Sequence, residues 1–332
     1  MSRGATVKLF LKRGALIAAA NWQVVLIQFV ADAFFKTLLL VPVVGGTALV
    51  VLLVGADPVD LLDLDARRVV PELAAMLLAH PVALVSFLTA VGLVLVGGSI
   101  LMFFVKGGAL TILVEAEHAA GPIERPPLTG ALIRRAGRFG LDRFTAGARR
   151  LFRRFFRLGV ALGVVYALSI GGYLVVILAP PGDTEGSWTA AATLASAALV
   201  AWITLVNFVY LLFQIVMAAD DCGLRRAAPR VARLLVRAPA TVGLVFLAML
   251  ALVVLTWAGA ILATAALGLI AFVPFVGLAS LPLQLLAWLL RGAVFQYIGL
   301  TSAGAYLRAY RVHQGVADGV AAGALDEGGQ PA

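Results

Sequence analysis

The sequence has one cysteine and three histidines among its 332 residues, and only 13% of the residues are charged. Cys222 alone forms neither an intramolecular disulfide nor a cysteine-based zinc site, and the separated histidines make no ligand cluster. The phosphate-binding, nucleophile-elbow and zinc-protease motifs are absent as well. We therefore expect a protein that is not an enzyme and that binds no metal and no cofactor.

Charged residues are too few for a soluble domain, in which they usually make up about 25%. Hydrophobic residues make up 62% of the chain, and the mean hydropathy is +1.02. These values indicate that the lipid bilayer is the solvent of this protein. The charges are confined to segments between apolar runs, which is typical of loops attracted to anionic lipid surfaces. This pattern argues against nucleic acid as a partner, although the net charge is +9.

Six apolar runs are long enough to cross a hydrocarbon core of about 30 Å. We expect an all-α polytopic membrane protein with six transmembrane helices and amphipathic cytoplasmic interfacial helices. The first run contains Asp32 and Lys36, which stand four residues apart and can pair on one helix face. The expected spans are, in chain order, 37–54, 82–105, 158–178, 189–217, 241–270 and 278–302.

Basic residues lie almost entirely on one side of these spans. Arg67 and Arg68 are the only ones in an expected outer loop, so the positive-inside rule places both termini in the cytoplasm. A composition rich in Ala, Gly, Leu and Val, with Arg preferred to Lys, is typical of a GC-rich bacterial genome and favours the bacterial inner membrane. We divide the chain into a basic, anchor-like cytoplasmic segment (1–20), a transmembrane domain (21–312) and a disordered cytoplasmic tail (313–332).

The segment 115–157 carries ten of the 26 Lys and Arg residues and lies between two apolar runs. Near its end, four arginines follow i, i+3, i+4, i+7 spacing among apolar and aromatic side chains. These are Arg150, Arg153, Arg154 and Arg157. We expect this stretch to lie along the cytoplasmic interface, where it binds anionic phospholipid headgroups, before it turns into the third span. The alternative is that these charges only set the topology.

Two inner segments share an order of features: an apolar helix, an acidic pair, a connector, an Arg-rich helix and another apolar helix. The acidic pair is Glu115 and Glu117 in the first segment and Asp220 and Asp221 in the second. A parallel duplication explains this order, and so does the general likeness of inner loops. Glu115, Glu117 and His118 also suggest a metal site on one helix turn, but a solvated helix end is the better interpretation because further ligands are missing.

Two short stretches stand out beside the later spans. The first reads Gln214-Ile-Val-Met-Ala-Ala-Asp-Asp-Cys-Gly-Leu-Arg-Arg-Ala followed by Arg233-Leu-Leu-Val-Arg, and the second reads Ala305-Tyr-Leu-Arg-Ala-Tyr-Arg. Together they resemble the six-helix membrane domain of bacterial glycerophosphoryl diester phosphodiesterases. The resemblance implies an α-helical membrane module over residues 21–311. It does not imply phosphodiesterase activity, because the soluble catalytic domain of those enzymes has no counterpart here.

Arg291 is the charge placed most deeply in an expected span, about 21 Å from its outer end. A charge at that depth usually faces the bundle interior or snorkels to an interface, and it is a candidate for function. We expect Arg291 to meet Asn207, Tyr210 and Gln214 of the fourth span in an anion or headgroup site. An arginine that only anchors its helix is the alternative.

These features favour a noncatalytic integral inner-membrane protein. Its basic cytoplasmic face would engage anionic lipid or a partner protein, and a homo-oligomer is one form of such partnership. The alternative is a small-solute or lipid permease with a polar site between the fourth and sixth spans. Polar side chains that converge inside the bundle would favour the permease.

Overall fold

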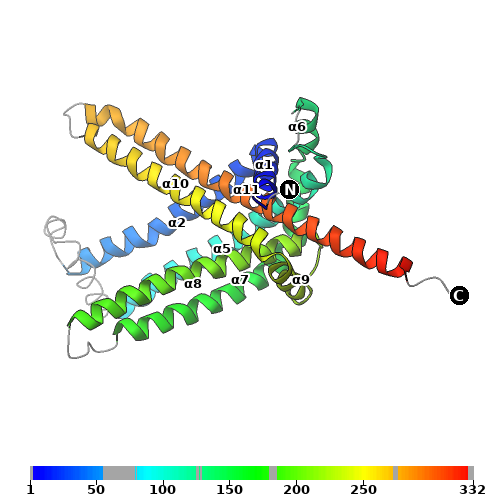
Figure 1. Cartoon of the computed structure of the whole chain (residues 1–332). Helices are drawn as coiled ribbons and strands as arrows, with labels where there is room; N and C mark the ends of the chain where they lie inside the picture. Colours follow the sequence, from blue (N-terminus) through cyan, green and yellow to red (C-terminus); the bar gives the residue numbers. More distant parts are fainter. Residues whose placement is uncertain are drawn as a thin grey trace. The chain divides into compact units, whose positions relative to one another are not determined.

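The computed structural model describes residues 3–54, 79, 81–124, 127, 129–178, 185–271 and 276–327. Over these residues the chain forms α-helices and no strand, as the sequence predicts. The helices are α1 Arg3–Ala20, α2 Trp22–Val54, α5 Pro81–Ala119, α6 Gly130–Ala136, α7 Leu141–Leu178, α8 Glu185–Ala219, α9 Leu224–Arg237, α10 Pro239–Ala271 and α11 Val276–Glu327 (Figure 1). Most of the expected outer loops, including Arg67 and Arg68, lies outside the described residues.

Six helices of the described ranges are long and apolar enough to cross a membrane, and they are α2, α5, α7, α8, α10 and α11. The chain is therefore a multi-pass integral membrane protein. The first candidate span is Trp22–Pro42, earlier than the expected 37–54. Lys36 Nζ donates to Asp32 Oδ2 at 2.6 Å, which confirms the predicted pair. Because the two charges neutralise each other, this stretch can enter the bilayer.

Two helices are much longer than the spans expected from the sequence. At 1.5 Å per residue, the 38 residues of α7 extend about 57 Å and the 52 residues of α11 about 78 Å, beyond a core of about 30 Å. The turn expected between Arg157 and the third span is wrong, because α7 continues unbroken through it. The tail expected to be disordered is helical as far as Glu327. In both places no proline intervenes, and a formed helix gains one hydrogen bond for each residue it adds.

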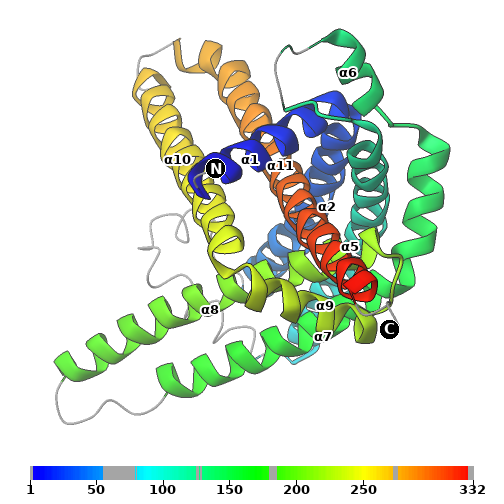
Figure 2. The same ribbon diagram turned by 45° about the vertical axis from the view of Figure 1, so that its right-hand side comes forward.

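The chain forms two compact units, one of Met1–Ile27 with Phe103–Ala332 and one of Gln28–Met102. In the second unit α2 and α5 meet at Phe35, whose ring lies where a side chain on Gly98 would stand. In the first unit α1 and α10 both pack on α11, and α7 runs beside α8 (Figures 1 and 2). All the candidate sites belong to the first unit.

The crossing of α1 and α11 depends on two glycines. A Cβ atom on Gly304 would lie 2.9 Å from the Cα atom of Gly14, and one on Gly14 would overlap the backbone of Thr301 and Ala305. Small residues allow helix backbones to approach this closely. The crossing therefore fixes where Arg13, the neighbour of Gly14, meets α11.

Asn21 joins α1 to the connector that follows α6. Its Nδ2 donates to the carbonyl oxygens of Ile17 and Ala136, both at 2.9 Å, and its Oδ1 accepts from the backbone N–H groups of Arg138 at 2.8 Å and Phe139 at 3.0 Å. The side chain is fully buried. Asn21 therefore satisfies backbone groups that are 115 to 118 residues away in sequence.

Replacement of Asn21 by alanine is expected to lower the free energy of unfolding by about 2 kcal/mol, because buried backbone groups lose their partners. The matched control is Asn207→Ala, which removes one hydrogen bond at an exposed position between two spans and is expected to cost about 0.6 kcal/mol. Unfolding titrations in mixed detergent measure both. Equal losses in the two variants would show that Asn21 does not hold the connector.

Candidate functional site

The four arginines expected to face lipid on α7 divide into two kinds. Arg154 Nη1 lies 2.5 Å and Arg150 Nε lies 3.6 Å from Asp221 Oδ1, in the turn between α8 and α9. Arg153 and Arg157 are exposed. Two of the four arginines therefore tie α7 to the turn between α8 and α9. The other two, Arg153 and Arg157, remain available to a ligand.

Helix α9 adds a second set of arginines. Its apolar side chains Ala227, Val231 and Leu234 are buried, and it carries no acidic residue. Arg230 forms an ion pair with Asp220, whose charge raises the pKa of the guanidinium. Six of the exposed arginines of the two helices form what we call the α7–α9 surface: Arg153, Arg157, Arg225, Arg226, Arg233 and Arg237. The Asp220–Asp221 turn lies between its two parts and binds arginines of both helices.

The expectation that Arg291 joins the polar residues of the fourth span is wrong. Its guanidinium carbon lies 4.5 Å from the ring centroid of Trp257 on α10 and 5.8 Å from that of Phe295 on α11. Such cation–π contacts stabilise a guanidinium among aromatic rings. The sequence indicated the contact between α10 and α11, because two spans joined by a very short connection usually pack side by side. Helix α8 meets α11 elsewhere, where the rings of Phe208 and Tyr306 lie 5.6 Å apart.

The polar residues of α8 face α5 and α7. Asn207 Oδ1 accepts a hydrogen bond of 2.6 Å from Tyr166 on α7. The Tyr210 ring lies 5.7 Å from Lys106 Nζ on α5, and Gln214 is buried. Further pairs between α7 and α8 join Ser169 to Trp202 and Tyr173 to Ser196, both at 2.9 Å. Hydrogen bonds of this kind hold neighbouring transmembrane helices together.

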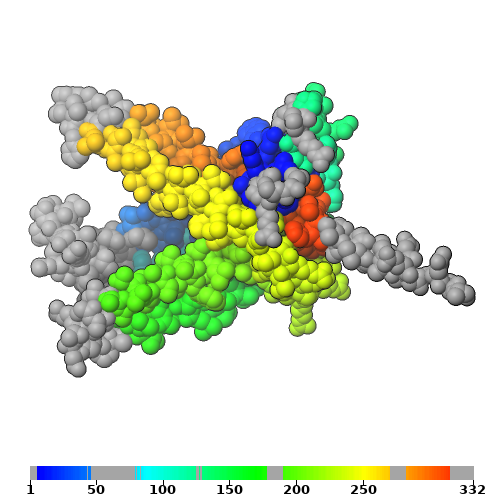
Figure 3. Space-filling view, viewed as in Figure 1, coloured from blue at the N-terminus to red at the C-terminus, as the bar shows by residue number. Residues whose placement is uncertain are grey.

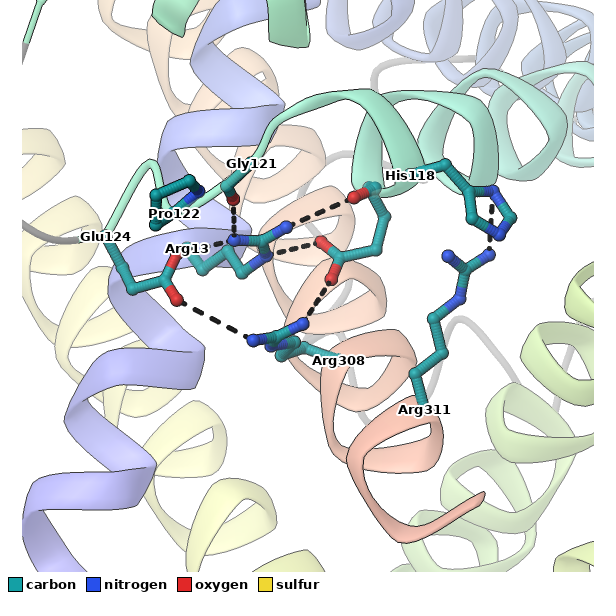
Figure 4. A pocket seen from close by; sticks show the side chains of 8 residues that line it. Arg13, His118, Gly121, Pro122, Glu124, Arg308 and Arg311 are labelled. Carbon is teal, nitrogen blue, oxygen red and sulfur yellow. Dashed lines mark hydrogen bonds and ion pairs between the residues drawn. The ribbon is translucent and has the colours of Figure 1, made fainter. Parts of the chain in front are cut away.

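Arg13 is the centre of a buried charge cluster that the sequence analysis missed. Its Nε donates to Glu117 Oε2 at 2.7 Å, and its Nη1 donates to Glu124 Oε2 and to the Gly121 carbonyl oxygen, both at 2.5 Å (Figure 4). Only 3% of Arg13 is exposed. Arg308 Nη1 lies 3.5 Å from Glu117, and its Nη2 lies 3.7 Å from Glu124. The cluster thus joins α1, the end of α5 and α11.

Charge pairing outweighs burial at Arg13 and Glu124. Burial by itself lowers the pKa of Arg13, but the hydrogen bonds and charges of Glu117 and Glu124 raise it overall. For Glu124, burial alone raises the pKa, whereas its backbone hydrogen bond and Arg13 bring it below the usual value. Both groups therefore stay ionised near neutral pH. Gly121 supplies the sharp turn after α5 with a φ of 59°, a backbone conformation that suits glycine.

An open pocket of about 430 Å³ lies at this cluster. Arg311 reaches it from α11, with its Nη2 3.1 Å from His118 Nδ1 (Figure 4). Glu117 and His118, considered above as metal ligands, thus face arginines. Arg13, Glu124 and Arg308 were missed because Arg13 and Glu117 are 104 residues apart and Glu117 and Arg308 are 191 apart. The signal in the sequence that could have indicated this charge cluster is the presence of acidic residues within a strongly basic segment.

The second acidic pair is arranged similarly. Asp220 Oδ2 accepts hydrogen bonds from Arg230 on α9 and from the Tyr310 hydroxyl on α11, and Gln314 Nε2 donates to it at 3.4 Å. Each acidic pair therefore sends one carboxylate to the same part of α11. This likeness fits a duplication, which remains a hypothesis.

No known protein family, curated protein or solved structure matches the chain. The resemblance to the membrane domain of glycerophosphoryl diester phosphodiesterases therefore stays a prediction.

Proposed function

We propose that this membrane protein is noncatalytic and binds anionic phospholipid headgroups through the α7–α9 surface. The observation that carries the proposal is made on helix α9, where Ala227, Val231 and Leu234 are buried while four arginines are exposed: Arg225, Arg226, Arg233 and Arg237. Each arginine near an anionic membrane surface contributes about 1 kcal/mol, so the set is strongly attractive to such lipids. Arg153 and Arg157 extend the charge onto α7.

We further propose that the protein lies in a bacterial cytoplasmic membrane with both termini inside. Support comes from the concentration of arginines in the segments after the second and fourth spans, which the positive-inside rule assigns to the cytoplasm. The inner leaflet offers the anionic lipids that the surface attracts. The permease hypothesis is weaker, because polar side chains of α8 pair with those of α7 and do not converge with Arg291.

Neutralising two arginines of the surface is expected to weaken anionic lipid binding. Native mass spectrometry of the purified full chain in nonionic detergent measures binding of added phosphatidylglycerol and phosphatidylcholine. Arg233→Gln combined with Arg237→Gln is expected to reduce the affinity for phosphatidylglycerol bound at the α7–α9 surface by at least about ten-fold, since each charge is worth about 1 kcal/mol. Binding of the zwitterionic lipid should stay unchanged.

The matched control removes two other exposed arginines, with Arg134→Gln and Arg135→Gln on α6. If the overall charge of the protein attracts the lipid, the control loses as much affinity as the α9 variant. That result would contradict the proposal. So would equal affinity of the unmodified protein for the two lipids.

A further inference from the structure

An open apolar groove of about 590 Å³ lies between α1 and the pair α10 and α11. Val7 and Leu11 line it from α1, Met249 and Leu252 from α10, and Ile298 from α11. Its volume is within the range of about 300–1,000 Å³ that is common for small-molecule sites. Figure 3 shows α1, in blue, against the yellow surface of α10. None of these residues belongs to the α7–α9 surface.

Two lysines lie at this apolar groove. Lys8 and Lys12 line it from α1, stand one helix turn apart and are exposed. Helix α1 contains no acidic residue. The two ammonium groups therefore add positive charge beside an apolar surface, which matches a ligand with an anionic head and a hydrocarbon chain.

The Thr301 hydroxyl is a second, independent sign of a ligand. Thr301 lines the groove and is 6% exposed, and its Oγ1 is buried without a hydrogen-bond partner among the described residues. Buried polar groups in proteins nearly always have such a partner. Tyr297, one turn earlier, already uses its hydroxyl to donate to the Ala15 carbonyl oxygen at 3.0 Å. The Thr301 hydroxyl is thus the polar group that the groove leaves for a bound molecule.

The position of Thr301 along α11 matches the polar end of a lipid. From Val276, the first residue of α11, it is about 38 Å along the helix at 1.5 Å per residue. The hydrocarbon core is about 30 Å thick, and the headgroup regions extend the bilayer to about 40–45 Å. With Val276 placed at the outer edge of the hydrocarbon core, Thr301 lies at the level where lipid esters and phosphates are found, while Ile298 and Leu252 line the groove beside it.

We propose that this groove binds one anionic glycerophospholipid from the bilayer. The acyl chain lies along the apolar side chains, Lys8 and Lys12 bind the phosphate, and the Thr301 hydroxyl donates to an ester carbonyl. The site goes beyond the proposed function, because it is a discrete position for a single lipid and stands whether or not the α7–α9 surface binds headgroups.

Native mass spectrometry of the full chain, titrated with phosphatidylglycerol or phosphatidylcholine, tests the site. The unmodified protein is expected to retain one phosphatidylglycerol more tightly than any further copy. Lys8→Gln combined with Lys12→Gln should weaken this first lipid by at least about ten-fold. Thr301→Val, which keeps the shape and removes the hydroxyl, should weaken it by about five-fold.

Arg233→Gln with Arg237→Gln serves as the cross-control, since it should weaken the later lipids and leave the first unchanged. Lipid binding at the α7–α9 surface and lipid binding in the groove can therefore be disproved independently of each other. The groove proposal is overturned if the lysine variant or Thr301→Val retains the first phosphatidylglycerol as tightly as the unmodified protein. It is also overturned if phosphatidylcholine occupies the first position equally well. Size-exclusion profiles confirm that each variant is folded.

Discussion

Replacement of Arg13 by methionine is expected to lower the free energy of unfolding by about 3–5 kcal/mol, because it leaves buried carboxylates without their cation. Glu117 is 4% exposed and Glu124 is 8% exposed, so water compensates neither of them well. Arg308 does not replace Arg13, since its nitrogens lie 3.5 Å and 3.7 Å from the same carboxylates. Unfolding titrations in mixed detergent, without added lipid, measure the loss.

Two further variants make the Arg13 result interpretable. Glu117→Gln should cost less than Arg13→Met, because Arg13 keeps Glu124 and the Gly121 carbonyl oxygen as partners. Arg134→Met removes an exposed arginine and should change stability by less than about 0.5 kcal/mol. A loss for Arg13→Met no larger than that for Arg134→Met would show that the cluster does not hold α1 to the end of α5.

Gly14→Ala is expected to destabilise the first unit by about 3 kcal/mol, because the added methyl group meets the backbone of α11. Its Cβ would lie 2.9 Å from the Ala305 nitrogen and would overlap the Thr301 carbonyl oxygen. A backbone cannot move aside by changing a rotamer, so the two helices must separate. Thermal unfolding of the full chain in detergent measures the effect.

Gly299→Ala is the matched control for this crossing. Gly299 lies on α11 and is exposed, and a Cβ atom there would meet nothing within 4 Å among the described residues. Alanine is the better helix former by about 1 kcal/mol, so this variant should be as stable as the unmodified protein or slightly more stable. If the two variants unfold at the same temperature, the close approach of α1 and α11 does not contribute to stability.

Several features of the fold were predictable because they depend on neighbours in the sequence. The six long apolar runs identify helices that suit a bilayer, since such a run must satisfy its own backbone hydrogen bonds there. The Asp32–Lys36 pair follows from a spacing of four residues. The amphipathic character of α9 likewise follows from the spacing of its arginines and apolar residues.

Helix lengths were predicted less well than helix positions. The spans expected from the sequence ended at the expected edge of the bilayer, yet α7 includes Arg150 and Arg157, and α11 includes Arg308 and Arg311. A charged residue limits the part of a helix that enters hydrocarbon, but it does not end the helix. The helix itself ends where the backbone conformation changes, as at Gly121 after α5.

The sequence by itself determined that this is an all-α membrane protein, because apolar length and helical periodicity are local properties. The tertiary structure alone decided which charges meet. Arginines in basic segments look alike in sequence, yet Arg13 is buried against Glu117 and Glu124, Arg154 binds Asp221, and Arg233 remains exposed. Only the crossing of α1 with α11 and the packing of α7 and α9 beside α8 bring particular charges together, because Coulomb attraction and hydrogen bonds act over a few ångströms in space, regardless of the distance along the chain.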